Sequence, residues 1–218
     1  MNPIYKTVES FDWMTIAILL SLVIIALAKY MFQTRFLSFL ILPFNNKYIV
    51  LYNKKGRLFS WFHVLMTLFQ LINLSLFIFL AWKVFSKDTS IDPIPIFALI
   101  FALVGGYQIT KGLLQSVKGF VFNTQDLVAE IIYTKLTYLN HSSLIMLISN
   151  ILLIYVLQDS KTVIYITIIL VFSINTIGLA NLLKNYQKVL VPNIFYFILY
   201  LCTLEIAPLV VIGSYLKV

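Results

Sequence analysis

The most unusual side chain in this 218-residue sequence is a carboxylate, Glu205, inside the last of its long apolar blocks. An acidic residue at membrane depth costs about 2.5–3.5 kcal/mol to insert, and desolvation favours its neutral form. Pro208 follows in the same block, and its ring disrupts the helical hydrogen bond to the Leu204 carbonyl. Two roles for Glu205 stay open: handling of protons or cations, or a hydrogen bond to a neighbouring helix or subunit.

Polar side chains inside other apolar blocks are candidate partners for Glu205. His63, Thr67 and Gln70 have helical spacing that places them on one face, with Asn73 near its edge. Later blocks add three more amides, Asn150, Asn175 and Asn181. These groups either line a polar seam in a helical bundle or hold helices together by hydrogen bonds of about 0.6–2 kcal/mol each.

Small residues recur in two blocks and predict close helix packing. Ala98, Ala102 and Gly106 repeat every four residues, a spacing that lets another helix approach closely. Gly105, beside Gly106, permits a bend, and Gly178 lies between the two later asparagines.

The sequence contains no motif for a known chemistry. It has no glycine-rich phosphate loop, no HExxH and no Cys/His cluster, and its one cysteine, Cys202, lies in an apolar block. His63 and His141 are too few and too far apart to argue for a haem. We therefore expect no catalytic residues, no metal site and no cofactor.

These side chains must be positioned by membrane-spanning helices. The chain is 61% apolar and 11% charged, against about half and a quarter in soluble domains. Backbone groups in lipid must be satisfied within each segment, so continuous apolar runs near 20 residues predict helices. We expect an all-α polytopic bundle, one membrane domain over 1–218, with about six spans: 13–30, 58–82, 94–109, 143–157, 163–182 and 194–215.

The net charge of +8 predicts the orientation of the bundle rather than nucleic-acid binding. Eleven Lys and Arg residues follow spans one, three and five, whereas five lie at the other ends. Because cytoplasmic loops are enriched in Lys and Arg, we expect the eleven-residue side to be cytoplasmic and both termini to be periplasmic.

Two segments on the predicted inner side are longer than turns. The apolar run Phe36–Phe44 is broken by Pro43, and we expect it to lie in the headgroup layer of the membrane. A short extended segment or a re-entrant turn is expected after it. The segment Thr110–His141 predicts an amphipathic helix leading into span four, with Thr134 and Thr137 on its polar face. That helix either lies on the membrane or forms a docking surface for a partner.

The chain also resembles an uncharacterised family of Bacteroidota inner-membrane proteins defined only by a domain of unknown function. The resemblance lies in Asp12-Trp13, Arg35-Phe36, Asn46-Lys47-Tyr48 and, most specifically, in LYLCTLEIAPL of the last span, residues 199–209. It covers nearly the whole chain and implies the cytoplasmic membrane of a Gram-negative envelope. It brings no catalytic residues.

Three functions are compatible with these patterns. We prefer a non-enzymatic subunit or accessory of an envelope membrane complex, with the bilayer and other membrane subunits or further copies as partners. The alternative is a small transporter or a proton- or cation-conducting protein using Glu205, with His63, Gln70, Asn73 and Asn175 along the path. A third is an enzyme acting on lipid, with His141, Asn140 and Lys118 near the inner headgroups.

Overall fold

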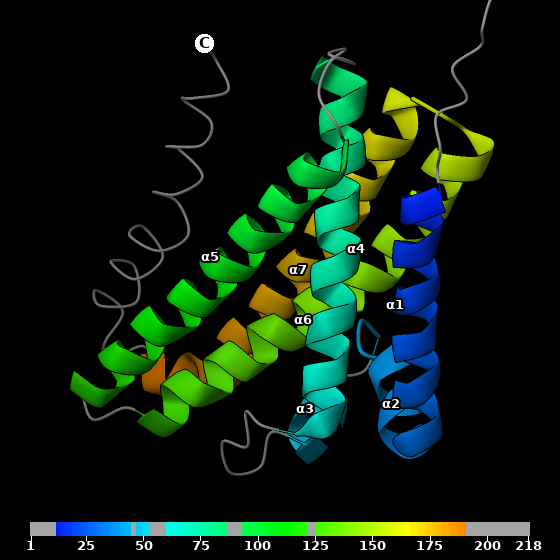
Figure 1. The fold of residues 1–218 in the computed structure, drawn as a ribbon. Helices are drawn as coiled ribbons and strands as arrows, with labels where there is room; N and C mark the ends of the chain where they lie inside the picture. The colour runs from blue at the N-terminus through cyan, green and yellow to red at the C-terminus, as the bar shows by residue number, and fades with distance from the viewer. Residues whose placement is uncertain (1–11, 45–46, 53–59, 87–92, 122–124, 191–218) are drawn as a thin grey trace, which may run out of the picture. The chain divides into compact units, whose positions relative to one another are not determined.

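Every element in the described part of the chain is a helix. The computed structural model describes residues 12–44, 47–52, 60–86, 93–121 and 125–190 (Figure 1). The helices are α1 (Asp12–Met31), α2 (Gln33–Leu40), α3 (Lys47–Tyr52), α4 (Trp61–Ser86), α5 (Pro93–Val121), α6 (Gln125–Ile151), its π-helical extension η1 (Leu152–Val156) and α7 (Lys161–Leu190). One compact unit ends at Gly178, within α7, and the contacts below all lie in that unit.

Five of the predicted spans are confirmed as helices long and apolar enough to cross a membrane. They are Asp12–Met31, Trp61–Ser86, Pro93–Leu114, Ala129–Val156 and Lys161–Leu182. The chain is therefore a multi-pass membrane protein with an all-helical fold. The sixth predicted span, 194–215, lies outside the described residues, together with Glu205, Pro208 and Cys202.

Span four begins well before the predicted residue 143, at Ala129 within α6. Thr134 and Thr137, which the sequence places on the polar face of this helix, are buried. Their hydroxyls donate to the carbonyls of Glu130 and Tyr133, one helical turn earlier, at 2.9 and 2.6 Å. A threonine hydroxyl that is satisfied by its own helix can be buried without a partner on another helix.

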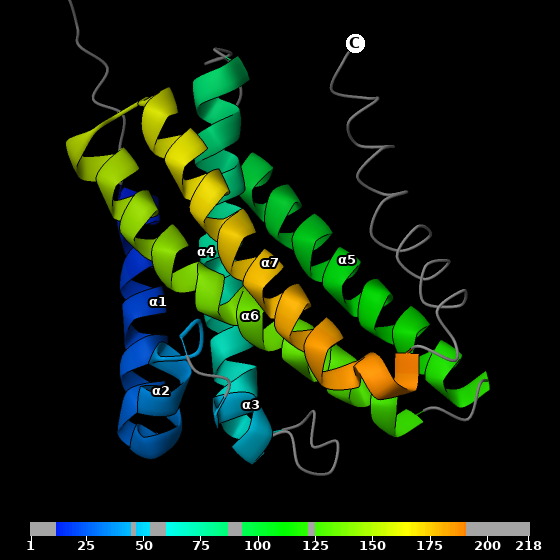
Figure 2. The same ribbon diagram turned by 180° about the vertical axis from the view of Figure 1, so that it is seen from behind.

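Helix α4 forms the centre of the bundle and contacts α1, α5 and α6 (Figures 1 and 2). At one end, the Trp13 ring lies 5.2 Å from Phe79 of α4 and 5.0 Å from Phe97 of α5. Such aromatic contacts add about 0.5–1.5 kcal/mol each beyond the area that they bury. The cluster joins the beginning of α1 to the α4–α5 pair.

The outer helices expose apolar side chains that a bilayer would cover. No residue is buried in the most apolar stretch of the α5 span, and few are buried in the spans of α1 and α7. Leu103, Ile169 and Phe172 are among the exposed side chains. Patches of this extent are unusual on soluble monomers, so the exposed faces support contact with lipid or with another membrane protein.

Helices α2 and α3 form a short hairpin that turns back into the bundle. The backbone at Phe32 leaves the helical conformation, and both views show α2 running back alongside the end of α1 (Figures 1 and 2). Phe36, Phe39 and Leu42 are buried, so one side of this run packs against protein, and its place in the headgroup layer stays a prediction. The segment after it is helical rather than extended.

Candidate functional site

A seam of buried polar side chains runs between α4 and α6. Near the beginning of α4, the His63 ring stacks on Tyr133, with 4.9 Å between ring centroids. Further along, Asn140 Nδ2 donates to Thr67 Oγ1 at 3.3 Å. All four side chains lie on the facing sides of the two helices.

The α4–α6 seam continues at two asparagines. Asn73 Nδ2 donates to the Phe69 carbonyl at 2.9 Å, and Asn150 Nδ2 donates to the Asn73 carbonyl at 3.0 Å. A carbonyl oxygen only accepts hydrogen bonds, so both contacts fix which end of each amide is the nitrogen. The two Oδ1 atoms therefore point away from these carbonyls.

Helices α5 and α7 contribute side chains at the edges of the seam. Gln108 Nε2 donates to Gln70 Oε1 at 2.9 Å, which ties α5 to α4. Asn175 Nδ2 donates to Ser142 Oγ at 3.0 Å, which ties α7 to α6. A further α7–α6 hydrogen bond joins Thr167 to Ser149 at 2.7 Å.

Six buried polar atoms along the seam have no hydrogen-bond partner among the residues that the structure describes. They are His63 Nε2, Gln70 Nε2, Asn73 Oδ1, Asn140 Oδ1, His141 Nδ1 and Asn150 Oδ1. A buried polar group without a partner costs about 1–3 kcal/mol. Donors and acceptors both occur in the set, and this mixture can be satisfied by water or by other polar side chains.

His141 connects the seam to the α2–α3 hairpin. Its Nε2 lies 3.3 Å from the Leu40 carbonyl, and its ring lies 5.4 Å from that of Phe39. Since the carbonyl only accepts, this contact places a proton on Nε2. Leu40 is the last residue of α2, where carbonyl groups lack helical partners, so His141 stabilises the end of the hairpin's first helix.

The second helix of the hairpin, α3, is held by aromatic rings. Tyr133 of α6 donates to the Tyr48 hydroxyl at 3.3 Å, and Tyr48 is fully buried against Phe39 and Phe62. Burial, together with the neighbouring Tyr133, raises the pKa of the Tyr48 phenol well above its ordinary value of 10.0. The phenol therefore stays neutral and serves as a hydrogen-bond partner.

The predicted packing residues have different surroundings. A methyl group on Gly178 would overlap the Tyr138 ring, so this glycine allows α7 to approach α6 closely. Gly105 faces Leu71 of α4 at an ordinary contact distance. Ala98, Ala102 and Gly106 are exposed instead, and a methyl group on Gly106 would meet nothing within 4 Å.

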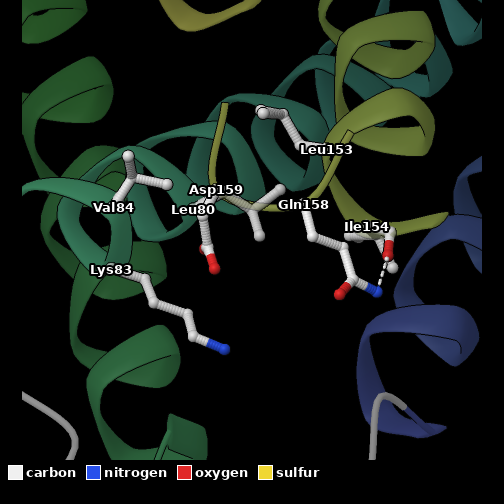
Figure 3. Close-up of a pocket in the computed structure, with 7 residues that line it drawn as sticks. All are labelled: Leu80, Lys83, Val84, Leu153, Ile154, Gln158 and Asp159. Carbon is white, nitrogen blue, oxygen red and sulfur yellow. Dashed lines mark hydrogen bonds between the residues drawn. The ribbon is translucent and has the colours of Figure 1, made fainter. Parts of the chain in front are cut away.

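A shallow pocket of about 50 Å³ lies at the opposite end of the bundle, between α4 and η1 (Figure 3). Leu80 and Val84 meet Leu153 and Ile154 there, and Figure 3 shows Lys83, Asp159 and Gln158 extending toward the same open side. Pockets for small organic ligands are about 300–1,000 Å³. This one has room for a water molecule or two.

The structure brings together five of the six polar residues singled out from the sequence. Five of them contact neighbouring helices: His63, Gln70, Asn73, Asn150 and Asn175. The sixth, Glu205, lies outside the described residues. The functional roles of all six stay predictions. His141 and Asn140 are buried and bound to α2 and α4, and the Lys118 side chain also lies outside the description.

Sequence reasoning missed several members of the site. Gln108, Tyr133 and Ser142 each bind a seam residue. Gln108 could have been found as the one amide in the α5 span, but tyrosine and serine are too common in membrane helices to stand out. Among the residues described, no group of three or more His, Cys, Asp or Glu side chains could hold a metal ion.

Comparison with curated proteins and with solved structures finds no match. Residues 14–216 match a family described as a domain of unknown function, DUF4271. This match covers all five described spans and the sixth predicted one. The chain therefore belongs to the DUF4271 family.

Proposed function

We propose that this protein is a non-enzymatic subunit or accessory of a membrane complex, and that the exposed small-residue face of α5 contacts another membrane protein or a second copy. The observation that carries the proposal is the stripe Ala98–Ala102–Gly106. It is exposed over its full length, with open space beside Gly106. Small residues at this spacing let the backbones of two helices approach closely, which improves their van der Waals packing. Contact between the same residues and lipid chains gives no such close backbone packing.

The seam supports the same proposal, because its amides are engaged in joining helices. Gln70, Asn73 and Asn150 are fully buried and bonded to neighbouring helices or to the backbone. Such groups fix helix register in lipid, where apolar side chains do not distinguish a neighbouring helix from an acyl chain. A scaffold of fixed register suits a protein that presents one face to a partner.

The proposed location is the inner membrane of a bacterium of the Bacteroidota. The excess of Lys and Arg after spans one, three and five supports an inner, cytoplasmic side at these ends and periplasmic termini. Fusion of a reporter that is active on only one side of the membrane to each terminus tests this orientation. Cytoplasmic activity at either terminus would contradict it.

The test of the complex is recovery of a partner from the native membrane in mild detergent, followed by mass spectrometry. Ala102→Leu and Gly106→Leu add bulk to the stripe and should each lose a stoichiometric partner that the wild type retains. Leu103→Phe adds bulk at an exposed position beside the stripe and should keep it. Equal recovery in all variants, or loss of the folded protein instead of the partner, would contradict the proposal.

A second function is favoured by the six buried polar atoms without described partners, which suit a proton- or cation-handling path. In this proposal Glu205 is the protonation site, and His63, Gln70, Asn73 and Asn175 lie along the path. Flux into liposomes carrying the purified protein should then be lost in Glu205→Gln. Under the complex proposal, Glu205→Gln instead leaves assembly nearly intact, because glutamine keeps a hydrogen bond, and liposomes show no flux.

A further inference from the structure

We propose that the α2–α3 hairpin binds an anionic phospholipid, with Arg35 holding the headgroup phosphate at the open end of the hairpin. This site is separate from the exposed face of α5, and it uses an arginine that is not part of the polar seam. It follows from the surroundings of Arg35, from the charge balance there and from the exposed face of the hairpin.

Arg35 lies where the two helices of the hairpin begin and end. Its guanidinium carbon is 4.9 Å from the Tyr52 ring centre and 5.8 Å from that of Phe32. Tyr52 is the last residue of α3, and Phe32 immediately precedes α2. The guanidinium therefore bridges both ends of the hairpin, on the side away from its turn.

These ring contacts leave the hydrogen-bonding capacity of Arg35 largely unused. Cation–π attraction acts on the charge, whereas a guanidinium also carries five N–H donors arranged to bind a carboxylate or phosphate. Within the described part of the chain, its contacts are with aromatic rings and no carboxylate pairs with it. A half-buried cation that has no counter-ion among the described residues offers a site for an anion.

The exposed side of the same hairpin is apolar, which favours a lipid over a free anion. Leu37 and Ile41 are about half exposed, and Phe44 at the turn is 92% exposed. Arg35 lies at the open end of the hairpin and Phe44 follows the end of α2, and both views place α2 and α3 at the end of the bundle where α4 begins (Figures 1 and 2). A phospholipid offers this same order, with a phosphate at the surface and acyl chains below it.

Arg35 could instead serve only to fasten the hairpin through its rings, and the two roles differ in their dependence on lipid. A fastening role stabilises the protein equally in any lipid. A headgroup role adds stability only when an anionic lipid is present, because a ligand that binds the folded state stabilises it in proportion to its affinity.

The experiment measures lipid binding by the full chain in neutral detergent, using native mass spectrometry and thermal unfolding with added phosphatidylglycerol or phosphatidylcholine. We expect the wild type to retain phosphatidylglycerol and to melt at a higher temperature with it. Arg35→Gln should weaken that binding about tenfold or more, and Arg35→Lys should weaken it less, because lysine keeps the charge without the planar donors. The matched control is Lys161→Gln, because Lys161 Nζ also lies over a ring, 5.6 Å from the Phe85 centre, and binding should be unchanged.

Four outcomes would overturn the proposal. The wild type could show no preference for phosphatidylglycerol. Arg35→Gln could lower the melting temperature equally in both lipids, which is the fastening role alone. Lys161→Gln could weaken binding as much as Arg35→Gln does, or inorganic phosphate could displace the lipid at millimolar concentration. Arg35→Lys keeps the test decisive if Arg35→Gln does not fold.

Discussion

Replacing Gly178 with alanine tests the closest helix contact in the bundle. A methyl group at this position would lie 2.5 Å from Cγ and 2.6 Å from Cδ2 of Tyr138. Carbon atoms in contact are normally about 3.5–4.0 Å apart, so the overlap is about 1 Å. Rotation of the ring about its Cβ–Cγ bond cannot relieve the overlap, because Cγ lies on that axis; the whole side chain or the helix must shift.

The expected loss follows from two opposing effects. Overpacking of this kind costs about 1–3 kcal/mol, and the rigid contact at Cγ places it near the upper limit. Alanine is favoured over glycine within a helix by about 1 kcal/mol. The net loss in the free energy of unfolding is therefore about 2 kcal/mol, which corresponds to about 4–8 °C in melting temperature for a chain of this size.

The assay is thermal unfolding of purified variants in one detergent, with Gly105→Ala and Gly106→Ala as controls. A methyl group at Gly105 would lie 3.7 Å from Leu71, and one at Gly106 would meet nothing within 4 Å. Both controls should match or slightly exceed the wild-type melting temperature. Equal behaviour of Gly178→Ala and Gly106→Ala, or an undiminished effect of Gly178→Ala in a Tyr138→Leu background, would refute the packing described for α6 and α7.

Substitutions at three further sites test the polar contacts. Gln70→Leu should lower the free energy of unfolding, because Gln108 then lacks its acceptor. Adding Gln108→Leu should recover part of that loss. A double-mutant cycle of the two residues should give a coupling energy of about 0.6 kcal/mol, and in any case less than about 2 kcal/mol. Asn150→Leu should change the free energy of unfolding by less than about 1 kcal/mol, because it removes a hydrogen bond and an unsatisfied oxygen together. Asn150→Asp should instead cost about 2.5–3.5 kcal/mol, because it buries a carboxylate. Similar melting temperatures for the two variants would be inconsistent with a buried site. Stability should fall as pH rises above about 10, since the folded protein holds the Tyr48 proton more tightly than the unfolded chain does, and Tyr48→Phe should flatten that fall in pH-dependent melting.

The membrane spans could be predicted from the sequence because their cause is local. A run of about 20 apolar residues must be helical in lipid, whatever it packs against. The beginning of span four is harder to place from a window of sequence. Thr134 and Thr137 look polar in a window of sequence, but each hydroxyl is satisfied by the carbonyl one turn before it, which only the helix geometry shows.

The helix faces and the hairpin could not be predicted in the same way. The spacing of Ala98, Ala102 and Gly106 is that of a packing stripe, yet no described helix lies on them. Such spacing shows how closely a helix could approach, but it does not show whether a helix is there. The α2–α3 hairpin depends on contacts distant in sequence. Leu40 and His141 are 101 residues apart, and Tyr48 and Tyr133 are 85 residues apart.

His141 and Tyr133 show how the hairpin and the α4–α6 seam depend on each other. Both residues belong to α6; His141 binds the carbonyl at the end of α2, and Tyr133 binds the α3 hydroxyl while stacking on His63 of α4. A displacement of α6 along α4 would therefore break contacts in the hairpin and in the seam together. The hairpin contacts described here therefore require this register of α6. A partner that shifted α6 would act on the hairpin as well, even from a binding face on another helix.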